Sequence, residues 1–159
     1  MKKLALIRHA KATHETGYAD FERPLTQKGI LDAAIMAGRL KEQDLVPRVL
    51  ISSPALRTIS TANIFSEHLS LATATEEKKI YDASEEELID VVMGLPDEIE
   101  FIGLVGHNPG MGQLLYYLSG AGHEMPTCAV AVIEFSLESW GDVTANSGKL
   151  TYFDSPKDF

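Results

Sequence analysis

The sequence has one cysteine, Cys128, among its 159 residues. A single cysteine cannot form an intrachain disulfide, a cysteine-rich zinc site or a CxxC redox pair. Its simplest use is as a small apolar side chain in a core. The absence of disulfides fits a reducing compartment.

Positive charge is also scarce. There are 14 Lys and Arg residues against 23 Asp and Glu residues, which gives a formal net charge of −9. Protonation of all five histidines would still leave the chain negative. Binding to nucleic acid or to an anionic membrane needs a surplus of positive charge. We therefore expect neither nucleic acid nor a membrane among the partners of this protein.

The sequence lacks a long hydrophobic run. The apolar stretch near the N-terminus, residues 4–7, ends at Arg8. The apolar region of a signal peptide needs about 7–15 residues, and a membrane-spanning helix needs roughly 20. The sequence thus predicts a soluble cytoplasmic protein made without a cleaved leader.

There is enough apolar material for one core, because 45% of the residues are hydrophobic. The length is ordinary for one domain, and we expect a single domain over residues 1–159, with fraying after Pro156. Short apolar runs predict strands over residues 3–8, 46–51, 101–105, 129–135 and 149–153. Helical signals lie between most of these runs. This alternation is typical of an α/β fold, here a three-layer α/β/α sandwich with a mainly parallel sheet.

The first predicted helix has a clear start and a clear apolar face. Thr26 is a suitable N-cap, and the helix is expected to end at about Lys41. Residues three and four apart lie on the same side of a helix. The buried face is predicted to consist of Ile30, Ala33, Ala34, Ala37 and Leu40.

Three further helices have recognisable start signals. Ser53 followed by Pro54 predicts an N-cap and a first helical residue, with the helix ending at about residue 69. Ser84 followed by three glutamates predicts a capping box. Asn108 is expected to cap a fourth helix.

Reactive side chains follow three of the predicted strands. The first strand ends in Arg8 and His9, the second is followed by Arg57, and the third is followed by His107. Parallel α/β sheets bind ligands beyond the carboxyl ends of their strands, where helix N-termini also favour negative charge. We therefore expect these two arginines and two histidines to form a site for a small dianion, most simply a phosphoryl group.

The residue types suit phosphoryl transfer. Arginine presents a planar fork of donors that matches phosphoryl oxygens two at a time. A neutral imidazole is an available nucleophile near neutral pH. A loose phosphoryl-transfer transition state needs alignment and charge stabilisation. The sequence therefore predicts a histidine nucleophile, whose phosphorylated form water would then hydrolyse.

Three segments together resemble the histidine phosphatase superfamily, the phosphoglycerate-mutase-like enzymes. Leu6-Ile7-Arg8-His9-Ala10 is similar to the "RHG" signature, Ser52-Ser53-Pro54-Ala55-Leu56-Arg57-Thr58 to the second element, and Gly106-His107-Asn108-Pro109 to the element with the second histidine. The resemblance implies a phosphoglycerate-mutase-like fold without metal or other cofactor. It also implies that His9 is the nucleophile, through Nε2, and that Arg8, Arg57 and His107 hold the phosphoryl oxygens.

The segment Asp20–Gly29 resembles the "D..RPLT..G" segment of SixA-like phosphohistidine phosphatases. This resemblance implies that Arg23 reaches the site as a further anion ligand, although an ion pair with Asp20 that orders the loop would explain it equally well. Asn108 has two readings as well, a contact with substrate or a helix cap.

One family feature is absent. Larger relatives carry a glutamate in the middle of the chain, which serves as general acid for an alcohol leaving group. No residue here aligns with it, and Asp82 and Glu85 are the candidate substitutes. Loss of the acid would slow ester hydrolysis most, because the imidazole that leaves phosphohistidine needs no further proton once its ring is protonated.

These observations lead to a main prediction and two alternatives. The main prediction is a phosphatase acting on protein phosphohistidine, with a signalling protein such as a histidine-phosphotransfer domain as partner. The first alternative is a phosphatase for a small phosphorylated metabolite, and the second is a non-catalytic module that binds phosphate. In all three cases we expect a small positive pocket on an acidic surface.

Overall fold

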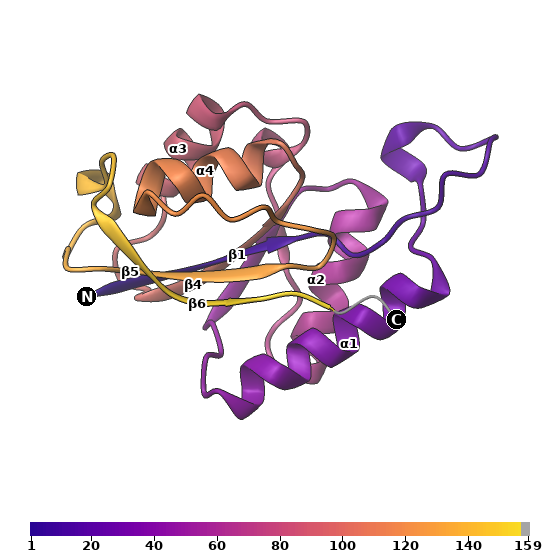
Figure 1. Ribbon diagram of the computed structural model, residues 1–159, viewed down its shortest axis with the longest axis horizontal. Coiled ribbons are helices and arrows are strands. Elements are labelled where there is room, and N and C mark those ends of the chain that lie inside the picture. Colours follow the sequence, from indigo (N-terminus) through magenta and orange to yellow (C-terminus); the bar gives the residue numbers. More distant parts are fainter. Residues whose placement is uncertain (157–159) are drawn as a thin grey trace.

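The computed structural model describes residues 1–156. Within these residues one sheet has the strand order β3-β2-β4-β1-β5-β6 (Figure 1). Its strands are β1 (Lys2–Arg8), β2 (Val49–Ser52), β3 (Thr75–Glu76), β4 (Phe101–Gly106), β5 (Val130–Phe135) and β6 (Gly148–Asp154). Only β5 runs opposite to the other five strands, so the predicted mainly parallel sheet is confirmed.

Helices cover both faces of this sheet. They are α1 (Gln27–Glu42), α2 (Leu56–His68), α3 (Glu85–Met93) and α4 (Gly110–Ser119), with short 3-10 helices η1 (Asp20–Glu22), η2 (Lys78–Ile80) and η3 (Trp140–Asp142). In Figure 1, α1 and α2 lie below the sheet, and α3 and α4 lie above it. The molecule is therefore the expected three-layer α/β/α sandwich.

Strand β1 explains why its sequence is an unbroken apolar run. Leu4 and Leu6 point into the core beneath α3 and α4, whereas Ala5 and Ile7 point into the core against α1 and α2. All four side chains are completely buried. A central parallel strand has two buried faces, and alternation of apolar and polar residues disappears for that reason.

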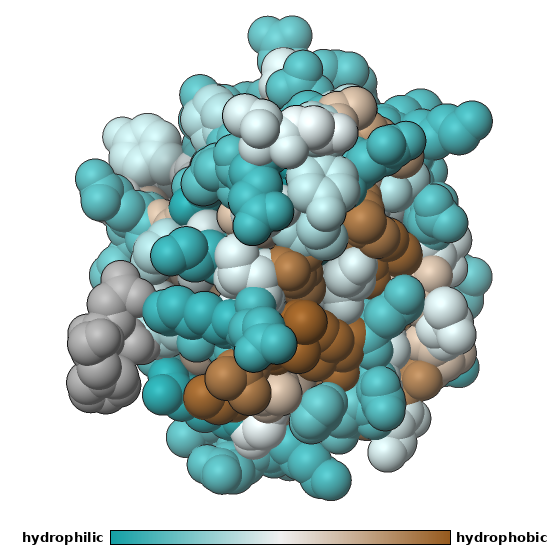
Figure 2. Space-filling view, turned by 90° about the vertical axis from the view of Figure 1, so that its right-hand side faces the viewer, coloured by the Kyte–Doolittle hydropathy of each residue, from teal (hydrophilic) through white to brown (hydrophobic). Residues whose placement is uncertain are grey.

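The predicted buried face of α1 is wrong at Ile30, which is 48% exposed. The helix is turned so that Gly29 faces inward instead. A Cβ atom on Gly29 would lie 2.2 Å from the carbonyl oxygen of Lys11, so the helix approaches the loop after β1 as only glycine permits. The outward side of α1 carries the exposed apolar residues Ile30, Leu31 and Ile35. Figure 2, which views the molecule from the right-hand side of Figure 1, shows apolar side chains on that face.

The prediction that Ser53 caps the second helix is also wrong. Helix α2 begins at Leu56, with Ala55 as N-cap and no capping bond from a side chain. The Ser53 hydroxyl accepts a hydrogen bond from the Ala55 N–H over 3.3 Å, and it also lies 2.7 Å from Nε2 of His107. Ser53 therefore lies two residues before the N-cap, and its hydroxyl connects the start of α2 to the second histidine.

The other predicted helix starts agree better with the observed ones. Thr26 accepts a hydrogen bond from the Gly29 N–H, and Ser84 forms the complete predicted capping box. For α4 the N-cap is Pro109, one residue later than expected, although Asn108 Oδ1 still accepts a hydrogen bond from Gly112 N–H. The second predicted strand starts late, at Val49, and β3 was not predicted at all.

No helix among residues 1–156 is long and apolar enough to cross a membrane. The fraying expected after Pro156 falls on residues 157–159, which lie outside the described residues.

Candidate active site

A pocket of about 610 Å³ lies at the carboxyl ends of the central strands. The sheet order places β4 between β2 and β1, and Arg8 is in register with Gly106. The three segments that carry the predicted site residues therefore meet at one edge. The lining consists of Arg8, His9, Lys11, Ala12, His14, Asp20, Arg23, Arg57, Tyr81, Asp82, His107, Asn108 and Thr127.

His9 is held in one tautomer by the backbone. Its Nδ1 lies 2.7 Å from the carbonyl oxygen of Ala10, which can only accept, so Nδ1 carries the proton and donates. Burial lowers the pKa of His9 to about 4, and the charges of Arg57 and Arg8 act in the same direction. The ring is consequently neutral at pH 7, and Nε2 keeps its lone pair. The arrangement is the one expected for attack by Nε2.

The two arginines have donors that no group among residues 1–156 accepts. Arg57 is only 6% exposed, and its Nε has no hydrogen-bond partner in that range. The Nε of Arg8 is buried and unpartnered as well, while its Nη1 donates to the Met125 carbonyl. A buried donor without an acceptor is costly. Both guanidinium groups line the pocket, where their charge favours the binding of an anion.

His107 is fixed on both of its ring nitrogens. Arg57 Nη2 donates to Nδ1 over 3.2 Å, and the ring therefore donates from Nε2 to the Ser53 hydroxyl. Burial lowers the pKa of His107 to about 3, with Arg57 as the second cause. The rings of His9 and His107 lie 5.5 Å apart, centroid to centroid. Ser53 is thus a site residue that the sequence presented only as a helix cap.

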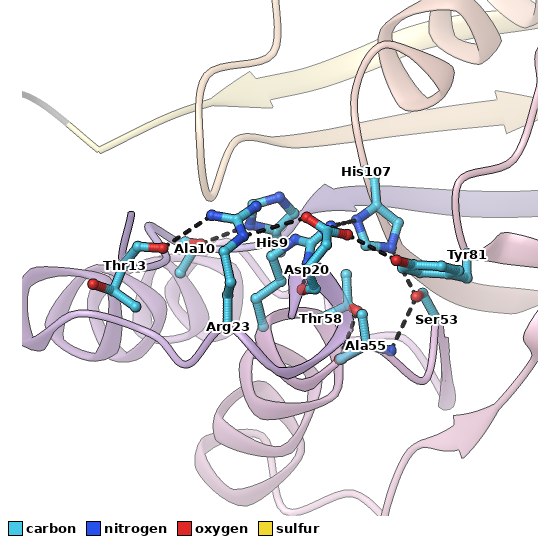
Figure 3. A network of polar contacts seen from close by, with 11 residues as sticks. His9, Ala10, Thr13, Asp20, Arg23, Ser53, Ala55, Thr58, Tyr81 and His107 are labelled. Carbon is cyan, nitrogen blue, oxygen red and sulfur yellow. Dashed lines mark hydrogen bonds and ion pairs between the residues drawn. The ribbon is translucent and has the colours of Figure 1, made fainter. Parts of the chain in front are cut away.

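Asp20 and Tyr81 were not predicted as site residues. The Asp20 carboxylate accepts from Arg57 Nη2 at 3.1 Å, from Arg23 Nε at 3.3 Å and from the Tyr81 hydroxyl at 2.8 Å (Figure 3). Its backbone carbonyl accepts a further bond from Arg57 Nη1. The Tyr81 hydrogen bond and the charge of Arg57 hold the pKa of Asp20 below its ordinary value, despite some burial.

Two predicted site residues remain, Arg23 and Asn108. Arg23 lines the pocket and forms the predicted ion pair with Asp20, whereas its role as an anion ligand stays a prediction. Asn108 lines the pocket while its side chain bonds to Met125 and Gly112.

The two candidates for general acid are separated by the structure. Asp82 lies in the pocket. Glu85 lies outside it, at the first residue of α3, and lines an adjoining hollow of about 700 Å³ that also reaches Arg8 and Asn108. Of the two, only Asp82 is placed to meet a ligand in the main pocket.

The balance of charge in the pocket is positive. Four cationic side chains and two carboxylates line it, although the whole chain carries a net charge of −9. Within residues 1–156 no group of three or more His, Cys, Asp or Glu side chains is arranged to hold a metal ion. The arrangement can bind a small dianion and present an imidazole nitrogen to it.

A family model described as the histidine phosphatase superfamily (branch 1) matches residues 4–82. The matched segment includes Arg8, His9 and Arg57. This segment makes up just under half of the chain, and over it the chain is similar to this superfamily. An uncharacterized protein of Mycobacterium tuberculosis strain H37Rv is 26% identical over 163 aligned residues, which cover 95% of this chain and 100% of the relative.

Solved structures share the fold over nearly the whole chain. The protein histidine phosphatase SixA complexed with tungstate has a TM-score of 0.83 at 22% identity, covering 96% of each chain. A candidate phosphohistidine phosphatase SixA from Agrobacterium tumefaciens has a TM-score of 0.82 at 24% identity, covering 98% of this chain and 99% of that one. The predicted phosphoglycerate-mutase-like fold is confirmed by these likenesses.

A more distant match is a mycobacterial glucosyl-3-phosphoglycerate phosphatase that complexes with VO3. Its TM-score is 0.72 at 13% identity, and the alignment covers 98% of this chain and 100% of that chain. The same fold therefore occurs in a phosphatase that is named for a small-molecule substrate.

Proposed function

We propose that this chain is a metal-independent phosphatase that uses His9 as nucleophile and removes the phosphoryl group from phosphohistidine in a protein. The match to the histidine phosphatase superfamily over residues 4–82 supports phosphatase activity. The observation that carries the mechanism is the state of His9. Its Nδ1–H is bonded to a backbone carbonyl, and its neutral Nε2 faces a pocket lined by arginines.

In the first step Nε2 of His9 attacks phosphorus, and the bond from phosphorus to the leaving group breaks. Arg8 and Arg57 bind the phosphoryl oxygens through guanidinium donors. The hydrogen bond from Nδ1–H to Ala10 stabilises the positive charge that develops on the ring. His107 and Arg57 hold each other in place beside the phosphoryl group.

In the second step water attacks the phosphorylated His9. The nitrogen–phosphorus bond breaks, Nε2 regains its electron pair, and inorganic phosphate leaves. The proton lost by the water remains on phosphate or passes to solvent. The arginines bind the same oxygens in both steps, so one site serves formation and hydrolysis of the intermediate.

Two features favour protein phosphohistidine over a small ester. The pocket opens to solvent through Lys11, His14 and Asp20, which are all exposed, so a phosphorylated side chain on a protein surface can enter. A large apolar side chain adjoins this rim in the sequence, because Phe21 follows Asp20 and is 43% exposed. Such a side chain suits contact with a protein surface.

The alternative is a small phosphomonoester as substrate. The adjoining hollow lined by Tyr116 and His123 favours it, since this space could hold the organic part of a metabolite. The glucosyl-3-phosphoglycerate phosphatase with the same fold supports it too. In that case Asp82 is the candidate acid, and Asp82→Asn would slow ester hydrolysis strongly.

The test is phosphate release from a phosphorylated histidine-phosphotransfer protein, with p-nitrophenyl phosphate in parallel and a chelator present. We expect faster release from phosphohistidine, unaffected by the chelator, and a loss of at least about 10³-fold in His9→Ala. The matched control is His68→Ala, because His68 is exposed on α2 and lies outside both hollows. Retained turnover in His9→Ala would exclude the mechanism, and faster ester hydrolysis would favour the metabolite.

A further inference from the structure

Asp20 occupies an unusual position for an acidic residue. Its carboxylate lies among the groups that are proposed to bind a phosphoryl dianion, with Arg57 on one side and Arg23 on the other. Tyr81 donates a third hydrogen bond to it. Figure 3 shows Asp20 between Arg23 and Tyr81, in front of the two histidines. A carboxylate in an anion site opposes binding unless it contributes something else.

The depth of Asp20 indicates which part of a substrate it would meet. Its side chain is 57% exposed, whereas that of Arg57 is 7% exposed. The phosphoryl group binds at the buried floor, and the nucleophile, phosphorus and leaving group lie nearly in line. Because His9 is on the floor, the leaving group must lie toward solvent. Asp20 lies on that side.

We propose that Asp20 faces the leaving group and selects substrates whose scissile bond is nitrogen to phosphorus, with an N–H on the leaving group. This inference rests on the proposed function and deepens it, since it names the residue that favours phosphoramidates over phosphate esters. The carboxylate accepts a hydrogen bond from the leaving group.

The proton and electron count is complete for a phosphorylated imidazole. In the reactive form the ring is a cation, with phosphorus on one nitrogen and a proton taken from solvent on the other. When Nε2 of His9 attacks, the ring nitrogen takes the electron pair of its bond to phosphorus, and the ring leaves as neutral imidazole. Its remaining N–H stays bonded to Asp20. No general acid is needed.

An ester behaves in the opposite way. Its leaving oxygen takes the electron pair and becomes negative unless a proton is supplied. Asp20 is ionised, because Tyr81 and Arg57 keep its pKa low, so it supplies no proton and repels the developing charge. Arg23, the nearest cation at the rim, is already engaged by Asp20 and by the Thr13 carbonyl.

The substitution Asp20→Asn tests this role, because it removes the charge and keeps an oxygen that can accept from Arg57 and Tyr81. The probes are phosphoimidazole and p-nitrophenyl phosphate, and the readout is the ratio of their kcat/KM values. We expect the ratio of phosphoimidazole to ester to fall by at least about tenfold. Tyr81→Phe is a second variant, which removes one of the hydrogen bonds that the carboxylate accepts. It should change the ratio by a smaller amount than Asp20→Asn does.

The matched control is Asp142→Asn. Asp142 is an exposed aspartate of η3 that lies outside the pocket and outside the adjoining hollow. We expect the ratio to change less than about twofold in this variant. Circular dichroism on each variant checks that the fold is intact.

Other outcomes would overturn the inference. An equal loss on both substrates in Asp20→Asn would mean that Asp20 only positions Arg57, and an equal gain would mean that it only blocks the anion site. Failure of the proposed function is visible separately. If wild type releases no phosphate from phosphohistidine protein while the ratio still falls in Asp20→Asn, the protein substrate is wrong and the selection by Asp20 stands.

Discussion

His9 and His107 are the side chains whose protonation this site controls most strongly. Burial and neighbouring arginines lower their pKa values to about 4 and about 3. A histidine in an unfolded chain has a pKa of about 6.5. Between these values the unfolded chain binds protons that the folded protein does not, so stability falls as pH falls from 6.5 toward 4.

This difference gives a measurable prediction for His107. Because His107 binds a proton on unfolding, proton linkage predicts that the free energy of unfolding falls by about 2 kcal/mol from pH 7 to pH 5. Urea unfolding at the two pH values measures the loss, and His107→Asn should reduce it by about that amount. An unchanged pH dependence in His107→Asn would show that the histidine titrates normally in the folded protein.

The nucleophile can be followed in the same pH range by NMR. With a pKa of about 4, His9 should remain neutral at pH 5.5, with its proton on Nδ1. The ring nitrogen shifts report both the charge and the tautomer. A ring that is half protonated near pH 6.5 would contradict the electrostatic account of the site.

Sequence reasoning at the residue scale found the residues whose motifs are short and contiguous. Arg8, His9, Arg57 and His107 all line the same pocket. Ser53, Asp20 and Tyr81 could not be assigned, because their importance lies in contacts with residues far away in the sequence. The Asp20 side chain was visible in a motif, but only the folded loop shows that Arg57 binds it.

At the scale of elements, the same distinction applies to helix starts. The Ser84 capping box was predictable, because both partners lie within one turn. The start of α2 was not, because the Ser53 hydroxyl bonds to His107 on another strand end. Similarly, the outward turn of Ile30 depends on how closely α1 approaches Lys11, which no periodicity reveals.

Two glycines of α1 provide a test of this packing. Gly29→Ala should destabilise the protein by about 1–3 kcal/mol, because its Cβ would collide with the Lys11 backbone. Gly38→Ala, with nothing within 4 Å of the new Cβ, should stabilise the helix by about 0.5–1 kcal/mol. Denaturant unfolding measures both. Equal effects of the two substitutions would mean that α1 does not approach the loop as described.

At the scale of the whole molecule, a positive pocket lies in a chain with a net charge of −9. The fold gathers arginines from separate segments at one end of the sheet, so the local charge opposes the overall charge. The composition alone excluded nucleic acid as an expected partner, but it could not locate this pocket. The pocket is located by the order of the strands, which places three strand ends side by side.

The exposed rim of the pocket leads to a prediction about substrate size. We expect kcat/KM for a phosphohistidine on a protein to exceed that for the free phosphorylated amino acid by at least about tenfold, because contacts away from phosphorus lower the barrier. Parallel assays of phosphate release compare the two. A preference for the free amino acid would favour a small-molecule phosphatase instead.

The central claim is that Nε2 of His9 carries the phosphoryl group during turnover. The most direct measurement is a single-turnover reaction with phosphohistidine substrate, followed by alkaline quenching and mass spectrometry of the peptide that contains His9. The account predicts a transient phosphate on His9 in the wild-type protein and none in His9→Ala, together with loss of turnover. Turnover by the wild type without phosphate on His9, or a phosphorylated residue elsewhere, would contradict it.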